Sequence, residues 1–428
     1  MANDRAGAAT DSAPTPTAGT SRDRRDSFQF AFLVFALTAG HTAASMALLV
    51  IPAVAPVVAA DYGIDPSLIG YQISIVSAGL ITSAMFLGNL SRKLGAGRTN
   101  QIGHGLVAGG MLLMLVPSPI SLIAGSYALG NGYGLLGPSS SSLLMRFAPA
   151  ARRNFVFSVH QTAIPIGGIL AALISPLIAI TLGWRWALVL AASLLLMVIA
   201  IMQGGRARWD DDRDHGTAAV SRNPLADFFM IWRDRRLRML SIVGGALCWG
   251  QFVVVSYTVV TCVQELGMSL VLAGTVLTIV QLSNGGGRVI AGWLADRVRS
   301  STRVITWIAW MMLATSIAAI WMNASWSALS LYLLFGLLGM ATGAWAGLLI
   351  ADVSRLAPHG RVSSAICGML IYINIGKFLG PIAFANVYAL TNSYGIAFGS
   401  MGLPAIVALV CLTSVTSMTR QARAARNA

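Results

Sequence analysis

The chain has 428 residues, of which 56% are hydrophobic and 10% are charged, and its mean hydropathy is +0.72. A soluble globular domain carries about a quarter charged residues, so this composition excludes that class and indicates a polytopic membrane protein. The net charge of +14 does not indicate a nucleic-acid-binding protein, because nearly all basic residues lie in loops and tails between apolar segments.

The first 27 residues are polar, with Pro, Thr, Asp and Arg interleaved. Such a segment cannot bury enough apolar surface to fold, so we expect a disordered tail over residues 1–27. It also lacks a short apolar core followed by a small-residue cleavage site, which argues against a cleaved signal peptide.

Twelve apolar segments follow, each long enough to cross a bilayer as a helix. We therefore predict an all-α membrane protein with twelve transmembrane helices. Four cysteines lie inside these segments without metal-type spacing, and we interpret them as packing residues: Cys248, Cys262, Cys367 and Cys411. The approximate limits of the segments are 29–58, 68–90, 100–116, 120–145, 154–181, 186–203, 239–264, 270–294, 303–322, 327–351, 362–390 and 395–418.

Basic residues mark every second loop, as Arg92 does after the second segment and Arg297 after the eighth. The alternate loops are nearly free of Lys and Arg, with Arg185 as the exception. The positive-inside rule then predicts that both termini are cytoplasmic. We expect a multi-pass protein of the cell inner (cytoplasmic) membrane.

The longest loop, residues 204–238, divides the chain into two halves. We predict a six-helix bundle over residues 28–203, a cytoplasmic linker, a second six-helix bundle over 239–419 and a cytoplasmic tail over 420–428. In the linker, a short helix along the membrane surface and a solvated tether are both compatible with the sequence. The helix would gather its apolar residues on one face: Leu225, Phe228, Phe229 and Trp232.

The two halves repeat one another. GNLSRKLG at residues 88–95 follows the second segment, and GWLADRVR at 292–299 follows the eighth. APAARR at 148–153 and APHGR at 357–361 likewise follow the fourth and tenth segments. Two related six-helix bundles form a transporter architecture, in which the substrate site lies at the repeat interface near the middle of the membrane.

With these repeats the sequence resembles the major facilitator superfamily over about residues 28–420. The signature of that family, G-x-x-x-D-R-x-G-R, is matched after the eighth segment by Gly292, Asp296 and Arg297. After the second segment Gly88 is kept, but Arg92 stands where the family has aspartate. The resemblance implies that these five residues take part in gating, and that the usual ion pair of the first half is altered.

An arginine four residues before this Gly-Trp, with a lysine in the eleventh helix, is similar to the oxalate/formate and monocarboxylate carriers. Arg288 and Lys377 fit that pattern. Arg288 lies eight residues before Asp296, which is about 12 Å along a helix and near the middle of an apolar layer about 30 Å thick. The resemblance implies an organic anion as substrate.

The distribution of acids leads to the same expectation independently. Of the fifteen acidic residues, ten lie in the tail or central loop, and the other five lie near the ends of apolar segments. An unpaired buried charge is costly, and arginine does not readily lose its proton. We therefore expect a carboxylate or sulfonate of the substrate to neutralise Arg288 and Lys377. The alternatives are that Lys377 reaches the interface or is neutral, and that Arg288 binds helix-end carbonyls.

Other polar residues at similar depth are weaker candidates. His41 can bind substrate or titrate near neutral pH, although a structural hydrogen bond is an equally good interpretation. His160 can face the inner cavity, and His104 fits a structural role. The remaining candidate substrate contacts are Gln281, Asn284, Asn131, Tyr133, Gln161 and Tyr257, with Trp249, Gln251 and Asn374 behind them.

We find no catalytic constellation and no metal or cofactor motif, and we predict a secondary carrier that works by alternating access. Its expected partners are a small anionic substrate, protons or a counter-anion, and the lipid bilayer, and we expect a monomer. A drug or metabolite exporter of the same superfamily is the first alternative, although the sequence lacks a buried acid for cationic drugs. A non-transporting membrane sensor or assembly factor is the second.

Overall fold

The computed structural model describes residues 19–149, 152–214, 216, 225–358 and 361–427. Its regular structure over those residues is entirely helical. The first half comprises α1 (Gly19–Ala53), α2 (Ala55–Tyr62), η1 (Pro66–Gly70), α3 (Tyr71–Phe86), α4 (Leu90–Leu94), α5 (Ala96–Leu113), α6 (Pro119–Phe147), α7 (Arg153–Gln161), α8 (Ala163–Thr181), α9 (Trp184–Gln203) and α10 (Arg206–Trp209).

The second half follows a central helix and has the same plan. Its elements are α11 (Ala226–Arg233), α12 (Arg235–Gln264), α13 (Leu270–Val298), α14 (Ser301–Ala319), α15 (Ala328–Gly343), α16 (Ala346–Leu356), α17 (Val362–Thr391), α18 (Tyr394–Gly399) and α19 (Gly402–Asn427). Each predicted apolar segment corresponds to one of these helices or to two consecutive ones, so the predicted fold class is confirmed.

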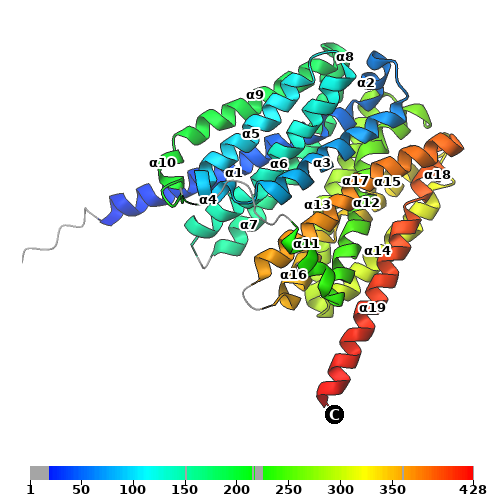
Figure 1. Ribbon diagram of the computed structural model, residues 1–428. Coiled ribbons are helices and arrows are strands. Elements are labelled where there is room, and N and C mark those ends of the chain that lie inside the picture. The colour runs from blue at the N-terminus through cyan, green and yellow to red at the C-terminus, as the bar shows by residue number, and fades with distance from the viewer. Residues whose placement is uncertain (1–18, 150–151, 215, 217–224, 359–360, 428) are drawn as a thin grey trace, which may run out of the picture.

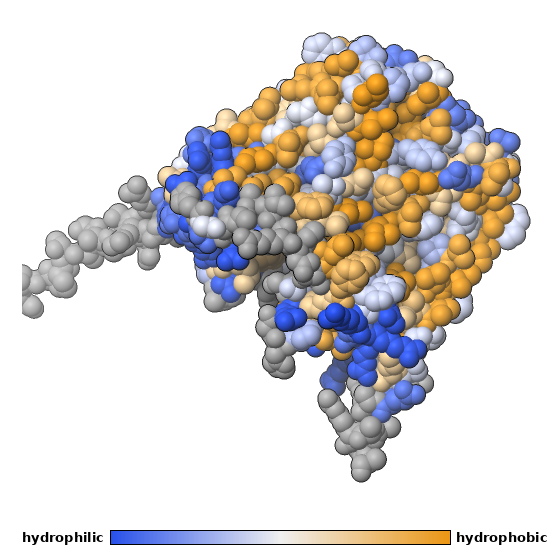
Figure 2. Space-filling model, in the orientation of Figure 1, coloured by the Kyte–Doolittle hydropathy of each residue, from blue (hydrophilic) through white to orange (hydrophobic). Residues whose placement is uncertain are grey.

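Ten helical segments of the described chain are long and apolar enough to cross a membrane. Helices α5 and α6, our predicted third and fourth segments, are not among them, because glycine, serine and other polar residues lower their hydropathy. Large apolar side chains are exposed along the flanks, among them Trp186, Trp310 and Leu403. Figure 2 shows this hydrophobic surface between hydrophilic ends, as expected for a protein surrounded by lipid.

Both ends of the described chain are more helical than we predicted. Residues 19–27, which we expected to be disordered, continue α1, because lengthening an existing helix needs no new nucleation step. Residues 1–18 lie outside the described residues. Helix α19 likewise runs on to Asn427 through the predicted tail. Of the cysteines, Cys248, Cys262 and Cys411 are buried as predicted, whereas Cys367 is exposed.

The helices form two bundles that lie side by side (Figure 1). In the first, α1 packs against α8 and α9, while α6 packs against α3 and α5. In the second, α12 packs against α17 and α19, while α15 packs against α13 and α14. The bundles meet mainly where α3 contacts α17 and where α8 contacts α13.

We call the end of the molecule that carries Arg92, Arg297 and Arg361 the basic face, and the other end the opposite face. At the basic face, α4, α7 and α10 of the first bundle stand apart from α11 and α16 of the second (Figure 1). The bundles converge toward the opposite face, where α2, η1 and α18 lie.

Close contacts hold the bundles together at the opposite face. The hydroxyl of Tyr257 on α12 lies 3.0 Å from the carbonyl of Ser67 in η1 and 2.9 Å from that of Pro381 on α17, and it can donate to either. Ser74 Oγ on α3 donates to the carbonyl of Phe378 on α17 at 2.7 Å. A Cβ on Gly70 would lie 2.0 Å from the Tyr257 hydroxyl, so this approach requires glycine.

The central loop is helical where it precedes the second bundle. Phe228 of α11 stacks on Tyr372 of α17 with ring centroids 4.9 Å apart. Phe229 and Trp232 are about half exposed, at 51% and 50%. The structure thus has the short helix rather than the solvated tether over residues 226–233, while much of the preceding loop lies outside the described residues.

Candidate functional site

Tyr133 of α6 lies at the centre of the polar cluster between the two bundles. Its helix approaches its neighbours closely, because a Cβ on Gly130 would lie 2.0 Å from the carbonyl of Val76 on α3. A Cβ on Gly132 would lie 2.4 Å from the carbonyl of Gly103 on α5. These glycines allow α6 to pack deep in the first bundle and so position the Tyr133 ring.

Two histidines and a serine surround this ring on the side of the first bundle. The hydroxyl of Tyr133 and Ser45 Oγ on α1 are 3.1 Å apart and share a hydrogen bond. The ring of His41, also on α1, lies 5.4 Å from the Tyr133 ring and 5.1 Å from the ring of His160 on α7. Both histidines are buried, with 6% and 5% exposure.

On the side of the second bundle the cluster contains Lys377 of α17. Its side chain is 5% exposed. The ammonium nitrogen lies 4.0 Å from the centroid of the Phe252 ring on α12 and 5.9 Å from that of Tyr133. Both distances suit a cation–π interaction, so aromatic faces accompany this charge. Within the described residues no carboxylate lies within 4.0 Å of it.

Arg288 of α13 supplies the second charge. Its Nε donates to Asn284 Oδ1 at 3.2 Å. It too has no carboxylate within 4.0 Å in the described part of the chain. The neutral Asn284 orients the guanidinium without cancelling its charge. The second bundle therefore contributes two cations, and Lys377 faces the Tyr133 ring of the first bundle.

The other predicted contacts lie outside this cluster. Gln281 is buried against α8, where a Cβ on Gly168 would lie 1.8 Å from its Nε2. Asn131 donates from Nδ2 to the carbonyl of Tyr127 on its own helix at 3.0 Å, and Gln161 is exposed. The structure thus brings together His41, Tyr133, Asn284, Arg288 and Lys377 from the predicted set.

Tyr257 needs a correction. We predicted a substrate contact, but the side chain is fully buried at the opposite face, stacked on Phe384 with centroids 3.9 Å apart. Its hydroxyl is engaged by the two carbonyls described above. This tyrosine therefore joins the bundles rather than contributing to the central cluster.

Sequence reasoning missed Ser45 and Phe252. Ser45 lies four residues after His41, on the same face of α1, so helical spacing was a usable signal. Phe252 had no such signal, because an aromatic residue on a spanning helix is ordinary. His104, by contrast, fits its structural interpretation, since Nδ1 lies 2.8 Å from the carbonyl of Asn100.

The predicted gating residues lie at the basic face. Asp296 and Arg297 are exposed, and the guanidinium of Arg297 lies 5.6 Å from the centroid of the Trp293 ring. Asp296 has no basic partner within 4.0 Å among the described residues. Gly292 has open space beside its Cα. Among the described residues, Asp296 and Arg297 thus form no ion pair with the first bundle.

In the first half an acid from the central loop lies near the loop of residues 88–95. Asp210 is buried, and its carboxylate accepts from the backbone N–H groups of Gly97 at 2.7 Å and Arg98 at 3.0 Å. This caps the start of α5, and burial raises the pKa of the Asp210 carboxyl. Gly95 has φ +91°, and a Cβ there would lie 2.3 Å from Asp210 Oδ1.

The neighbouring acids extend this attachment. Arg146 at the end of α6 pairs with Asp211, and with Asp212 at 3.1 Å. The backbone N–H of Asp214 donates to the carbonyl of Arg92 at 2.8 Å. The start of the central loop is thus bound to the basic face of the first bundle. Gly88 lies beside this attachment, with open space for a Cβ apart from one contact at 3.8 Å.

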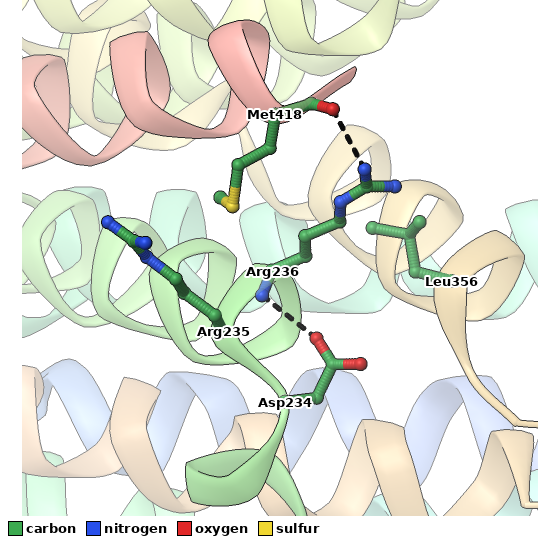
Figure 3. A pocket seen from close by; sticks show the side chains of 5 residues that line it. All are labelled: Asp234, Arg235, Arg236, Leu356 and Met418. Atoms are coloured by element: carbon green, nitrogen blue, oxygen red, sulfur yellow. Dashed lines mark hydrogen bonds between the residues drawn. The ribbon is translucent and has the colours of Figure 1, made fainter. Parts of the chain in front are cut away.

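A separate pocket of about 360 Å³ lies at the basic face of the second bundle and is shown in Figure 3. Arg236 donates to the carbonyl of Met418 at 2.9 Å, and Asp234 caps the first turn of α12. Leu356 and the extended Arg235 complete its wall. Because Arg236 and Asp234 are already paired within the chain and none of the cluster residues lines this pocket, we place the candidate site at Tyr133.

Comparison with known sequences identifies one family and several transporters. The family model described as Major Facilitator Superfamily matches residues 31–381. The benzoate transport protein of Acinetobacter baylyi is 23% identical over 394 residues, 82% of each chain. The gentisate transporter of Corynebacterium glutamicum is 24% identical over 378 residues, covering 83% of this chain and 81% of that one.

Solved structures agree on the fold. The crystal structure of the peptide transporter POT in complex with sulfate superposes with a TM-score of 0.71 at 15% identity, covering 91% of this chain and 94% of the other. At that identity the likeness concerns the fold alone. The family model and the sequence relatives, which are transporters, confirm that the chain is a carrier rather than an enzyme.

Proposed function

Since this chain belongs to the major facilitator superfamily and is a multi-pass membrane transporter, we propose that it carries a small organic anion, a carboxylate or sulfonate. The observation that carries the proposal is the pair of cations without acidic partners. Lys377 Nζ lies 5.9 Å from the centroid of the Tyr133 ring and Arg288 bonds Asn284, and neither has a carboxylate within 4.0 Å in the described part of the chain.

The physical reason is the cost of burying charge. A cation removed from water must be paired or partly neutralised, and rings and an amide do this only in part. An anion between Arg288 and Lys377 would complete the pairing. The guanidinium can hold a carboxylate through two parallel hydrogen bonds, while the ammonium acts as a point charge.

Aromatic carboxylates are the favoured members of this class. Tyr133 and Phe252 present ring faces within 5.9 Å of Lys377 Nζ, so an aromatic ring attached to the carboxylate would find apolar contact beside the charge. The relatives named for benzoate and gentisate carry aromatic carboxylates, which supports this choice.

Transport would proceed by alternating access between two bundles. The positive-inside rule favours the basic face as the cytoplasmic side, with both termini inside the cell. We further propose that the protein is a monomer in the inner membrane. In the structure the two bundles then contact each other at the extracellular side and stand apart at the cytoplasmic side. Asp296, Arg297 and Gly292, with Gly88 and Arg92 in the first half, would latch the cytoplasmic side in the other state, and net transport would be anion exchange or proton symport.

Counterflow in proteoliposomes tests the proposal. We expect uptake of radiolabelled benzoate, gentisate or benzenesulfonate by vesicles preloaded with the same unlabelled anion, and no uptake of the uncharged benzamide. Arg288→Ala and Lys377→Ala should each reduce uptake at least tenfold, about 1.4 kcal/mol of lost anion stabilisation or more. Arg303→Gln, an exposed arginine at the basic face, is the matched control and should retain it.

A wild-type rate in both the Arg288 and Lys377 variants would eliminate the anion clamp. The exporter alternative makes the opposite prediction, namely that a cationic aromatic compound is transported and benzoate is not. The central cluster disfavours it, because its fixed charges are positive and would repel such a compound.

A further inference from the structure

The two histidines of the central cluster have unused hydrogen-bonding capacity. Both ring nitrogens of His41 and Nδ1 of His160 are buried and have no hydrogen-bond partner. A neutral imidazole has one donor and one acceptor nitrogen, and a buried polar atom without a partner is costly. Such atoms persist where a ligand or a proton completes them.

The surroundings define which charges these imidazoles face. Around His41 they are His160 on α7, His104 on α5 and Tyr133 on α6, with Arg288 and Lys377 beyond the Tyr133 ring. Helices α8 and α9 also pack on α1, and they add no ionisable side chain at this depth. α12 carries its ionisable side chains at Arg235, Arg236, Arg238, Cys248, Tyr257 and Cys262, and α2 carries Asp61 and Tyr62 at the opposite face. Among the described residues, the contacts of His41 therefore include no carboxylate that could stabilise an imidazolium.

We propose that His41 and His160 together form the site that takes up the proton transported with the anion, which makes the carrier a proton–anion symporter. This inference rests on the proposed function and adds the coupling ion. The proton would come from water at one face, add to an unpartnered imidazole nitrogen, and return to water at the other. No bond to the anion forms or breaks.

Charge balance gives the coupling. In the described part of the chain, Arg288 bonds an amide and Lys377 lies against ring faces, so a proton on the histidines would add a third positive charge. A bound monocarboxylate cancels one of those charges and so lowers the electrostatic cost of adding a proton to the histidines. Anion and proton thus favour each other's binding, and this linkage is reciprocal. The site carries the same net charge empty as it does with both ligands.

Access to water favours His160 as the entry point. It lies seven residues after Arg153, where α7 begins at the basic face, about 10 Å along the helix. Its neighbour Gln161 is exposed, and the helix is interrupted there, because Pro165 has no N–H for the Gln161 carbonyl. A proton can pass from this break to His160 and on to His41, whose ring lies 5.1 Å from that of His160 and 5.4 Å from that of Tyr133.

Proteoliposomes separate coupling from anion binding. Two measurements are compared for benzoate and benzenesulfonate: counterflow at equal pH, and accumulation driven by a pH difference of about one unit, with passive entry into protein-free liposomes subtracted. A carrier that moves one proton per anion should accumulate the anion about tenfold under that difference. In His41→Gln/His160→Gln we expect accumulation to fall to the equilibrium level and to be reduced by a larger factor than counterflow, because Arg288 and Lys377 still hold the anion.

His104→Gln is the matched control, a buried histidine of α5 whose Nδ1 lies 2.8 Å from the carbonyl of Asn100, and should accumulate normally. Size-exclusion profiles and the single variants check folding. Retained accumulation in the double variant would overturn the proposal. Equal loss of counterflow and accumulation in a folded variant would also overturn it, because the histidines would then hold the anion. Wild-type protein without counterflow for either probe would instead overturn the anion assignment itself, and this inference with it.

Discussion

Gly70→Ala should shift the protein away from the state that is closed at the opposite face. The added methyl group would lie 2.0 Å from the Tyr257 hydroxyl and 2.1 Å from Cζ of its ring. The ring cannot easily yield, because it is fully buried and stacked 3.9 Å from Phe384. The backbone at Gly70 is itself right-handed helical, with φ −60°, so alanine introduces no strain other than this contact.

Overpacking of a tight contact costs about 1–3 kcal/mol. The clash exists only while the bundles are closed at that face, so the cost changes the ratio of the two states by about 5-fold to about 150-fold. Gly109→Ala is the matched control, because its Cβ meets nothing within 4 Å.

A cysteine at Ser67 reports the opening, since this side chain is 3% exposed in the closed state. With the exposed Cys367 replaced by serine, the labelling rate of Ser67→Cys by a membrane-impermeant maleimide measures the population of the open state. Gly70→Ala should label several-fold faster than Gly109→Ala. Equal rates in the two variants would refute the assignment of this contact as the closure.

Three further outcomes follow from the same structure. Phe252→Leu removes the ring 4.0 Å from Lys377 Nζ and should lower the thermal stability of the substrate-free protein by about 0.5–2 kcal/mol. The loss should be smaller when a carboxylate is bound, and equal losses in the two states would contradict the cation–π role. Gly130→Ala places a methyl group 2.0 Å from a backbone carbonyl and should cost at least about 1–3 kcal/mol in thermal unfolding, while Gly137→Ala, which meets nothing within 4 Å, should be neutral. Burial raises the pKa of the Asp210 carboxyl above its value in the unfolded chain, so the folded protein holds this proton more tightly. As pH rises from the unfolded pKa to the folded pKa, wild type should therefore lose stability relative to Asp210→Asn. A stability difference that stays constant with pH would refute this.

Much of the fold was predictable because the membrane imposes it. Apolar length and the alternation of basic loops define where helices cross, and those properties are local in sequence. Arg288, Lys377 and Tyr133 could likewise be selected individually, because a charge or a glycine-flanked tyrosine inside an apolar segment is conspicuous without knowledge of its neighbours.

The partners of those residues were not predictable, because they come from helices distant in sequence. Nothing local relates His41 to His160, or Phe252 to Lys377. Tyr257 illustrates the converse: its polarity suggested a substrate contact, but carbonyls from η1 and α17 use its hydroxyl. Asp210 is similar, since a run of three aspartates is usually solvated, and only contact with α5 buries one of them.

The attachment of residues 210–214 to the first bundle shortens the tether between the two halves. In the loop of residues 204–238, hydrogen bonds of Asp210 and Asp214 attach the N-terminal part to the first bundle, and stacking of Phe228 on Tyr372 attaches the C-terminal part to α17. Only residues 215–225 separate these two attachments, and eleven residues span at most about 40 Å when fully extended. Cutting the chain within that stretch leaves both fastenings in place, so two separately expressed halves should reassemble into one carrier.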